Sequence, residues 1–255
     1  MRIVVKVGTS TLTHSTGRLN IRRVEALCRV LSDLKNAGHE IVLVSSGAIA
    51  MGVGKLSLKE RPRDIPGKQA CAAVGQCELM YIYDKFFGEY GHTTAQVLLT
   101  RDCVNDPRRL SNIRNAFDRL LDLGALPIIN ENDTVATEEI EFGDNDTLSA
   151  VVATTVRADL LILLSDIEGL YTADPHKDPN AKLISRVEKL TDEIMAMGGG
   201  KGSALGTGGM ATKLHAAQIA TEAGIDMVIA NGERPERLYD IVAGAPIGTR
   251  FLGRK

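Results

Sequence analysis

Short apolar runs rich in valine, isoleucine and leucine alternate with helix-period segments along most of the chain, and this alternation constrains the fold most strongly. Each run is almost entirely apolar, as is typical of strands covered on both faces. The runs span residues 3–7, 41–45, 95–99, 126–129, 160–164 and 227–230. Strands that alternate with helices favour an α/β fold with a mostly parallel central sheet and helices on both of its sides.

The segments between the runs repeat apolar residues at the i, i+3, i+4, i+7 spacing of amphipathic helices. The first such segment follows Asn20, a good helix cap, and ends at Gly38, a residue type that commonly terminates helices. Two later segments end in the same way, at Gly124 and Gly224. Residues 137–143 are an exception and predict a small exposed β-excursion. No Pro/Gly/Ser-rich linker divides the chain, so we expect a single domain over residues 1–255.

Charge and composition exclude several classes of partner. The net charge is −2 and no basic run interleaved with aromatic residues occurs, so we expect no nucleic-acid partner. No stretch approaches the roughly 18 consecutive apolar residues of a membrane-spanning helix, so we expect no membrane association and a cytoplasmic location. The four cysteines lie far apart and the five histidines show no metal-binding spacing, which predicts reduced thiols and no metal site built from these residues.

Two loops have the character of phosphate-binding elements. The first, KVGTS at residues 6–10, places Lys6 inside an apolar strand, where an ammonium group is costly unless it meets an anion. Gly8 allows a ligand to approach the backbone closely. The alternative is an edge-strand lysine that reaches water, and the loop alone does not decide between the two. A similar turn at residues 44–52, VSSGAIAMG, leads from a strand into a helix whose first amides could bind an anion.

The second loop, GTGGMATK at residues 206–213, runs into a helix and combines exposed glycine amides with Lys213. This combination suits nucleotide phosphates. The spacing of a Walker A loop is absent, whereas Gly206, Gly208 and Ala211 satisfy the looser dinucleotide pattern. That pattern must follow a strand, and the residues before it have no strand character. We therefore favour nucleotide binding over a dehydrogenase.

Polar residues follow several of the predicted strands. Two of these motifs lie at the ends of predicted strands: INEND at residues 129–133, and the pair Ser165 and Asp166. A third, GDNDTLS at residues 143–149, opens a predicted helix. Open α/β sheets bind ligands at this edge, although each motif alone could be an ordinary capped turn. Lysines, glycine-rich loops and carboxylates at one edge suit phosphoryl transfer. No side chain is recognisable as an activated nucleophile, and a carboxylate acceptor with a pKa near 4.3 needs no base.

Taken in order, these motifs resemble the amino-acid kinase superfamily and, within it, the glutamate 5-kinases. KVGTS, SSGAIA, INENDTVAT, GDNDTLS, SDIEGLYTADP and GTGGMATK carry the resemblance, which covers essentially the whole chain. It implies a three-layer α/β/α sandwich around a mostly parallel sheet. It also implies transfer of the ATP γ-phosphate to the side-chain carboxylate of L-glutamate, with Mg²⁺, in the first step of proline biosynthesis.

The resemblance assigns roles to individual residues. It implies that Lys6 and Lys213 flank the transferring phosphoryl group and that Asp146 orients both lysines. The residues implied to bind glutamate are Ser46, Asp133 and Asn145, with Asn130 and Gly47 as further contacts. The residues implied to contact ATP are Lys6, Ser165, Asp166, Thr207, Gly208, Gly209, Met210, Ala211, Thr212 and Lys213. The part of the chain before about residue 160 would mainly bind substrate, and the later part ATP.

Partners and rivals follow from the same resemblance. It implies a homo-oligomer, for which residues 78–90 offer a contact helix, and an association with glutamyl phosphate reductase, the next enzyme of the pathway. Many family members carry a C-terminal PUA domain, which we do not expect here because the chain stops at Lys255. The nearest rival is a sister kinase for N-acetylglutamate, aspartate, carbamate or UMP; Asp133 disfavours an N-acylated acceptor, which has no ammonium group. A non-catalytic ATP- or amino-acid-sensing module is disfavoured by the presence of Lys6, Asp146 and Lys213.

Overall fold

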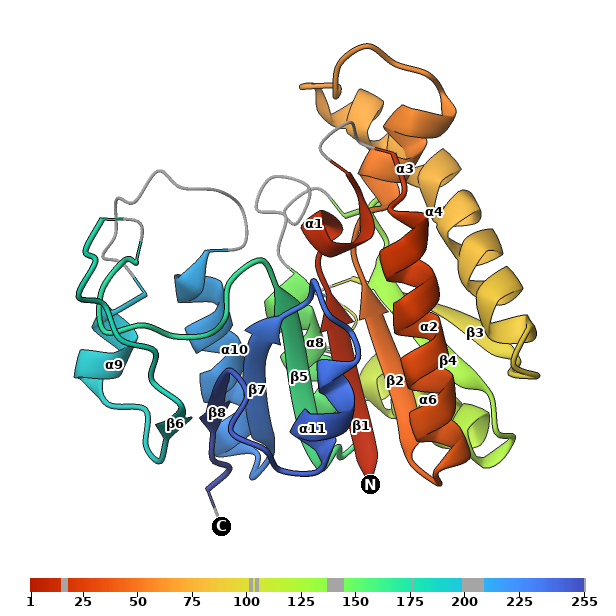
Figure 1. Cartoon of the computed structure of the whole chain (residues 1–255). Coiled ribbons are helices and arrows are strands. Elements are labelled where there is room, and N and C mark those ends of the chain that lie inside the picture. The colour runs from red at the N-terminus through yellow and green to blue at the C-terminus, as the bar shows by residue number, and fades with distance from the viewer. Residues whose placement is uncertain are drawn as a thin grey trace.

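The computed structural model describes residues 1–14, 18–100, 103, 106–136, 145–175, 177–198 and 209–254. In these residues eight strands form one sheet in the order β3-β4-β2-β1-β5-β7-β8-β6 (Figure 1). The strands are β1 (Arg2–Val7), β2 (Glu40–Ser45), β3 (Thr94–Leu99), β4 (Leu126–Glu131), β5 (Leu160–Ser165), β6 (Arg186–Val187), β7 (Asp226–Asn231) and β8 (Thr249–Phe251). The helices are α1 (Thr9–Leu12), α2 (Ile21–Asn36), α3 (Ala48–Lys55), α4 (Ile65–Gly88), α6 (Pro107–Asp122), α8 (Asn145–Thr155), α9 (Asp192–Ala196), α10 (Met210–Glu222) and α11 (Arg237–Val242).

The predicted mostly parallel sheet is confirmed. All six predicted strands are present, and they pair with one another in parallel from β3 through β7. Only β8 runs antiparallel to its neighbour β7, and β6 pairs in parallel with β8. Strand β6 has two residues and β8 has three, too few to produce the apolar run on which the sequence prediction depended.

The two faces of the sheet are covered by different helices, which gives the expected three layers. Alternate residues of β1 point to opposite faces: Ile3, Val5 and Val7 pack in one core, and Val4 in the other. The first core also contains side chains of α2, α4 and α11, and the second those of α6, α8 and α10. Figure 1 shows the first set of helices in front of the sheet and the second behind it. Lys6 shares the parity of Val4 and so faces the layer of α8 and α10.

Local signals at the helix ends are also confirmed. The Asn20 side chain accepts a hydrogen bond from the backbone N–H of Arg23 at 3.2 Å and caps α2. The three predicted terminal glycines, Gly38, Gly124 and Gly224, all have positive φ, as expected just beyond a helix. The predicted β-excursion at residues 137–143 lies outside the described residues. None of the described helices is both long and apolar enough to cross a membrane.

Helices α3 and α4 approach each other unusually closely through two glycines. A Cβ atom on Gly75 of α4 would lie 1.7 Å from the carbonyl oxygen of Ala48, the first residue of α3. A Cβ atom on Gly52 of α3 would lie 1.8 Å from the carbonyl oxygen of Cys71. Both positions therefore require glycine for steric reasons, because the atoms in the way belong to backbone and cannot rotate aside.

Substituting Gly75→Ala should therefore destabilise the protein, by about 1–3 kcal/mol or more, because α4 must move away from α3. Gly88→Ala is the matched control on the same helix, since a Cβ atom there meets nothing within 4 Å. That control should be neutral or stabilise by up to about 1 kcal/mol through higher helix propensity. Urea denaturation of the two variants measures the difference. Equal unfolding free energies would contradict the close packing of α3 and α4.

Candidate active site

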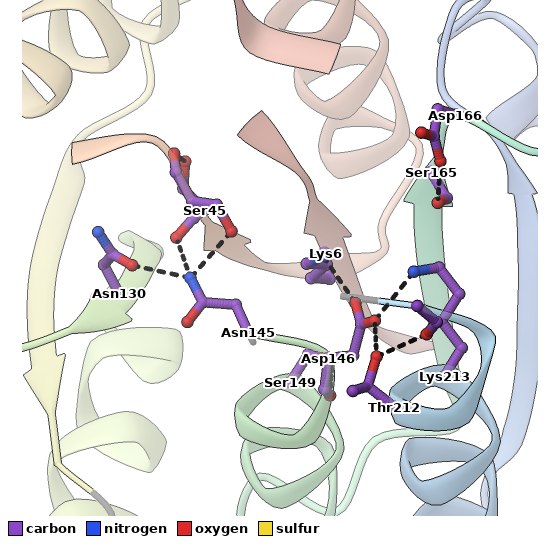
Figure 2. A network of polar contacts seen from close by, with 12 residues as sticks. Lys6, Ser45, Asn130, Asn145, Asp146, Ser149, Ser165, Asp166, Thr212 and Lys213 are labelled. Atoms are coloured by element: carbon purple, nitrogen blue, oxygen red, sulfur yellow. Dashed lines mark hydrogen bonds and ion pairs between the residues drawn. The ribbon is translucent and has the colours of Figure 1, made fainter. Parts of the chain in front are cut away.

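The carboxyl ends of the parallel strands bring the predicted site residues to one edge of the sheet. Lys6 lies near the end of β1, Asn130 near the end of β4, and Ser165 at the end of β5. Ser46 follows β2 directly, and α8 begins at Asn145. Figure 2 shows that Asn145 and Asp146, at the start of α8, lie between the end of β2 and the first turns of α10.

A buried carboxylate joins the two lysines that the sequence singled out. Asp146 Oδ1 lies 2.6 Å from Lys6 Nζ, and Asp146 Oδ2 lies 3.1 Å from Lys213 Nζ (Figure 2). The three residues are 8%, 1% and 4% exposed for Lys6, Asp146 and Lys213. They come from β1, α8 and α10, so three separate parts of the chain meet here. The cluster carries two positive charges and one negative charge within a few ångströms.

The two lysines decide the ionisation of Asp146. Burial alone would raise the pKa of this carboxyl, because it penalises the charged form, but the charges and hydrogen bonds of Lys6 and Lys213 outweigh it. The pKa of Asp146 is therefore held below its ordinary value. Asp146 remains a carboxylate at neutral pH and fixes the positions of both ammonium groups.

The start of α10 contributes further polar groups beside Asp146. Gly209 is the N-cap of this helix, and Met210 and Ala211 are its first residues. The Thr212 hydroxyl lies 3.0 Å from Asp146 Oδ2 and 2.8 Å from the carbonyl oxygen of Gly209, and its proton can be donated to either. This end of α10 lies beside the buried charges. Thr207 and Gly208, which the sequence analysis assigned to ATP, lie outside the described residues.

The second predicted ATP-contacting pair lies at the end of β5. Ser165 is buried, Asp166 is exposed, and the Ser165 hydroxyl donates a hydrogen bond to Asp166 Oδ1 at 3.0 Å. Strand β5 pairs with β1, so this pair lies at the end of the strand next to the one that carries Lys6. Figure 2 shows the pair near Lys213 rather than near Asn145.

Asn145 links the ends of two strands, β2 and β4, on the other side of Asp146. Its Nδ2 lies 2.9 Å from the carbonyl oxygen of Ser45, 3.0 Å from Ser46 Oγ and 2.9 Å from Asn130 Oδ1. Two of the predicted glutamate-binding residues, Ser46 and Asn145, are therefore in direct contact, and Asn130 joins them. Asp133 lies in the turn after β4 and is half-buried.

Gly47 shapes the turn after Ser46. Its φ of 101° falls in the left-handed region, where an L side chain is strained, and it is the N-cap of α3. The turn brings Ser46 back over the end of β1, since the Ser46 backbone N–H donates to the carbonyl oxygen of Val7 at 3.1 Å. The strand-to-helix turn predicted at residues 44–52 is confirmed.

Two polar side chains that no sequence motif indicated reach this cluster from α4. The Tyr83 hydroxyl lies 2.8 Å from Ser45 Oγ, and Gln76 Oε1 accepts a hydrogen bond from Asn130 Nδ2 at 2.8 Å. Burial raises the pKa of Tyr83, so this phenol stays protonated. Only the presence of polar residues on a mostly apolar helix could have indicated them. Their contacts with the strand ends depend on how α4 packs.

No group of three or more His, Cys, Asp or Glu side chains suited to a metal ion occurs in the part of the chain that the structure describes. Asp146, a buried carboxylate of the site, is already engaged by two lysines. These donors do not form a protein-built cage for Mg²⁺. Mg²⁺ bound mainly through nucleotide phosphates and water would need no such cage.

Comparisons with known proteins agree with this geometry. The model of the amino acid kinase family matches residues 1–231. The chain is 57% identical over 258 residues to the glutamate 5-kinase of Clostridium perfringens, an alignment covering all of this chain and 96% of that protein. It is 55% identical over 251 residues to the glutamate 5-kinase of Clostridium acetobutylicum, covering 98% and 94% of the two chains.

A solved structure has the same fold at low identity. The carbamate kinase from Giardia lamblia bound to AMP-PNP superposes with a TM-score of 0.71 and 17% sequence identity, covering 99% of this chain and 98% of that one. At this identity the likeness shows the fold alone. It agrees with the three-layer arrangement and the mostly parallel sheet described above.

Proposed function

This chain belongs to the amino acid kinase family, and we propose that it transfers the γ-phosphate of ATP to the side-chain carboxylate of L-glutamate. The observation that carries the proposal is the buried Lys6–Asp146–Lys213 cluster, which lies directly beside the Asn145 cluster. The identity of 57% and 55% to two glutamate 5-kinases supports glutamate as the acceptor.

In the proposed reaction a carboxylate oxygen of glutamate attacks the γ-phosphorus of ATP. The bond from that phosphorus to the bridging oxygen breaks, and ADP leaves with the electron pair. The acceptor carboxylate is ionised at neutral pH, so the site needs no general base. The products are ADP and the acyl phosphate L-glutamyl 5-phosphate.

The protein's contribution would be positioning and charge compensation, which dominate catalysis of phosphoryl transfer. Lys6 and Lys213 would offset negative charge on the transferring group from two sides. Asp146 would hold both ammonium groups in place before the substrates arrive. Burial of the three side chains strengthens these interactions, because water screens them little. Mg²⁺ would enter with ATP, where it neutralises phosphate charge.

The two clusters support a division of labour within a single domain. We assign glutamate binding to Ser46, Asp133 and Asn145, which precede residue 160. We assign ATP binding to Ser165, Asp166 and residues 207–213, together with Lys6. Lys6 would serve both substrates, because β1 lies between β2 and β5.

An acceptor panel tests the proposal. ADP release should depend on L-glutamate, and hydroxylamine should trap the acyl phosphate as a hydroxamate. N-acetylglutamate, aspartate, carbamate and UMP serve as the competing acceptors. Turnover with one of these but not with glutamate would assign the chain to a sister kinase. Binding of ATP without turnover on any acceptor would instead support a sensing module.

Two further proposals concern assembly and location. The contact segment proposed for an oligomer, residues 78–90, covers the C-terminal part of α4 and the two residues after it; here Leu79, Tyr83 and Phe87 are buried in their own subunit and Tyr81 is 64% exposed. Tyr81 is therefore the side chain of this helix that a second subunit could cover, and light scattering of the wild-type protein tests for a dimer. A functional link to glutamyl phosphate reductase and a cytoplasmic location remain predictions.

A further inference from the structure

We propose that Gln76, on α4, is a positioning residue for glutamate binding, because it completes the hydrogen bonding of the Asn130 carboxamide, which in turn holds Asn145. The inference rests on the proposed function and deepens it. Gln76 belongs to none of the sequence motifs and contacts the motif residue Asn130. Four carboxamides, Gln96, Gln76, Asn130 and Asn145, form a hydrogen-bonded chain, and Gln76 acts through the last two, whereas the exposed Gln96 only occupies the solvent end.

The backbone fixes the orientation of Asn130. The Glu131 N–H can only donate, and it donates to Asn130 Oδ1 at 2.9 Å. The same Asn130 oxygen accepts from Asn145 Nδ2 at 2.9 Å. Asn130 Nδ2 must then point the other way, where it meets Gln76 Oε1 at 2.8 Å. A flipped Asn130 would place its NH₂ group against two donors, Glu131 N–H and Asn145 Nδ2.

The other end of the chain is fixed in the same manner. The carbonyl oxygen of Ser45 can only accept, and Asn145 Nδ2 lies 2.9 Å from it. Asn145 Nδ2 has two protons for three acceptors: Ser45 O, Ser46 Oγ and Asn130 Oδ1. A correctly oriented Asn130 therefore determines how those protons are shared, and with them the position of the Ser46–Asn145 pair.

Gln76 is not held by a backbone group of the described residues, and its role is to accept a hydrogen bond from Asn130. It must present an acceptor to Asn130 Nδ2, because Asn130 is only 2% exposed and an unpaired amide there is costly. Its own NH₂ group donates to Gln96 Oε1 at 3.1 Å, and Gln96 is exposed. Gln76 follows Gly75, the residue at which α4 packs closely against α3, and its side chain reaches Asn130 of β4.

Three substitutions of similar length separate the acceptor role from mere packing. Gln76→Glu keeps an acceptor for Asn130, and the exposed Gln96 carboxamide can rotate to donate to the new carboxylate. Gln76→Met offers neither donor nor acceptor. Gln76→Lys offers only donors and favours the flipped Asn130. Gln96→Met is the control at the solvent end of the chain.

We expect Gln76→Met and Gln76→Lys to raise the KM for glutamate by roughly tenfold, as expected when a buried hydrogen bond is lost. The KM for ATP should change less than about twofold. Gln76→Glu and Gln96→Met should stay near wild type in both constants. A Glu variant as impaired as the Met variant, or a Met variant with an unchanged KM for glutamate, would overturn the proposal. Thermal unfolding of each variant is measured in parallel, since a purely structural role would lower the melting temperature without this pattern in KM.

A measurement without substrate keeps this test separate from the proposed function. In ¹H–¹⁵N spectra, the Asn130 side-chain NH₂ resonances should shift and exchange faster in the Met and Lys variants but not in the Glu variant. If that pattern is absent, the role assigned to Gln76 is wrong even in an active enzyme. If the pattern holds but wild type makes no hydroxamate from glutamate, it is the proposed function that fails.

Discussion

Replacing Lys213 with methionine should lower the turnover of L-glutamate by about 10²- to 10³-fold, the loss typical of one preorganised electrostatic contact. The Lys213 ammonium is buried and lies 3.1 Å from Asp146, so it reaches the site with a fixed position. Without it the cluster has one positive and one negative charge, and the charge on the transferring phosphoryl group is compensated from one side only. Methionine keeps most of the side-chain volume, so the packing of α10 should survive. Steady-state ADP release at saturating substrates measures the effect.

Two companion variants make the result decisive. Lys189→Met removes an exposed lysine and should leave turnover unchanged. Lys213→Arg keeps the positive charge opposite Asp146 and so protects folding, but its planar guanidinium cannot replace a compact ammonium group. Turnover of the arginine variant should therefore fall even if the methionine variant is too unstable to assay. Wild-type turnover in either variant would show that the role assigned to Lys213 is wrong.

The variant Asp146→Asn should lose most of its turnover and about 3–5 kcal/mol of unfolding free energy at neutral pH. Asp146 is 1% exposed and contacts both buried lysines. An asparagine leaves two ammonium groups close together with no compensating charge. Urea denaturation at pH 7 measures the loss. The control, Asp122→Asn, changes an exposed carboxylate at the end of α6 and should cost little.

The pH dependence of the unfolding free energy tests the role of Asp146 independently. The pKa of Asp146 is lower in the folded protein than its ordinary value, so the unfolded chain binds the proton more readily. Its contribution to stability is therefore present above the unfolded pKa of about 3.9 and is lost as the pH falls through the lower folded pKa. The unfolding free energy of Asp146→Asn should lack this part of the acid-induced decrease. An identical decrease in the variant and in the wild type would contradict the lowered pKa.

The sequence was sufficient for the central sheet because its strands are mostly apolar and, apart from the edge strand β3, almost wholly buried. The six runs from residue 3 to residue 230 needed no tertiary information, since mostly apolar stretches already specify covered strands. Strands β6 and β8 could not be predicted in this way, because each gains its pairing from the edge of a sheet that already exists. The order of strands likewise depends on packing and not on local pattern.

Part of the candidate site could also be predicted from the sequence, and part depends on packing. The positions of Lys6, Asp146 and Lys213 at strand and helix ends were visible as motifs, and the structure brings these three side chains into contact. The polar side chains of α4 were not visible as motifs. Gln76 and Tyr83 sit on a helix whose other residues are mainly apolar, and their partners lie on β4 and β2. Such contacts follow from how closely α4 approaches α3, which no local spacing encodes.

The central place of β1 has a consequence for the order of folding. Strand β1 is completed only after β5 has formed, because it pairs with β5 and its Arg2 N–H donates to Asp159, 157 residues later in the chain. Contacts this distant in sequence slow folding, since a long loop must close before they form. The cluster around Lys6 is completed later still, because its second lysine, Lys213 on α10, lies 67 residues after Asp146. During synthesis, therefore, the charged centre can assemble only after α10 has left the ribosome.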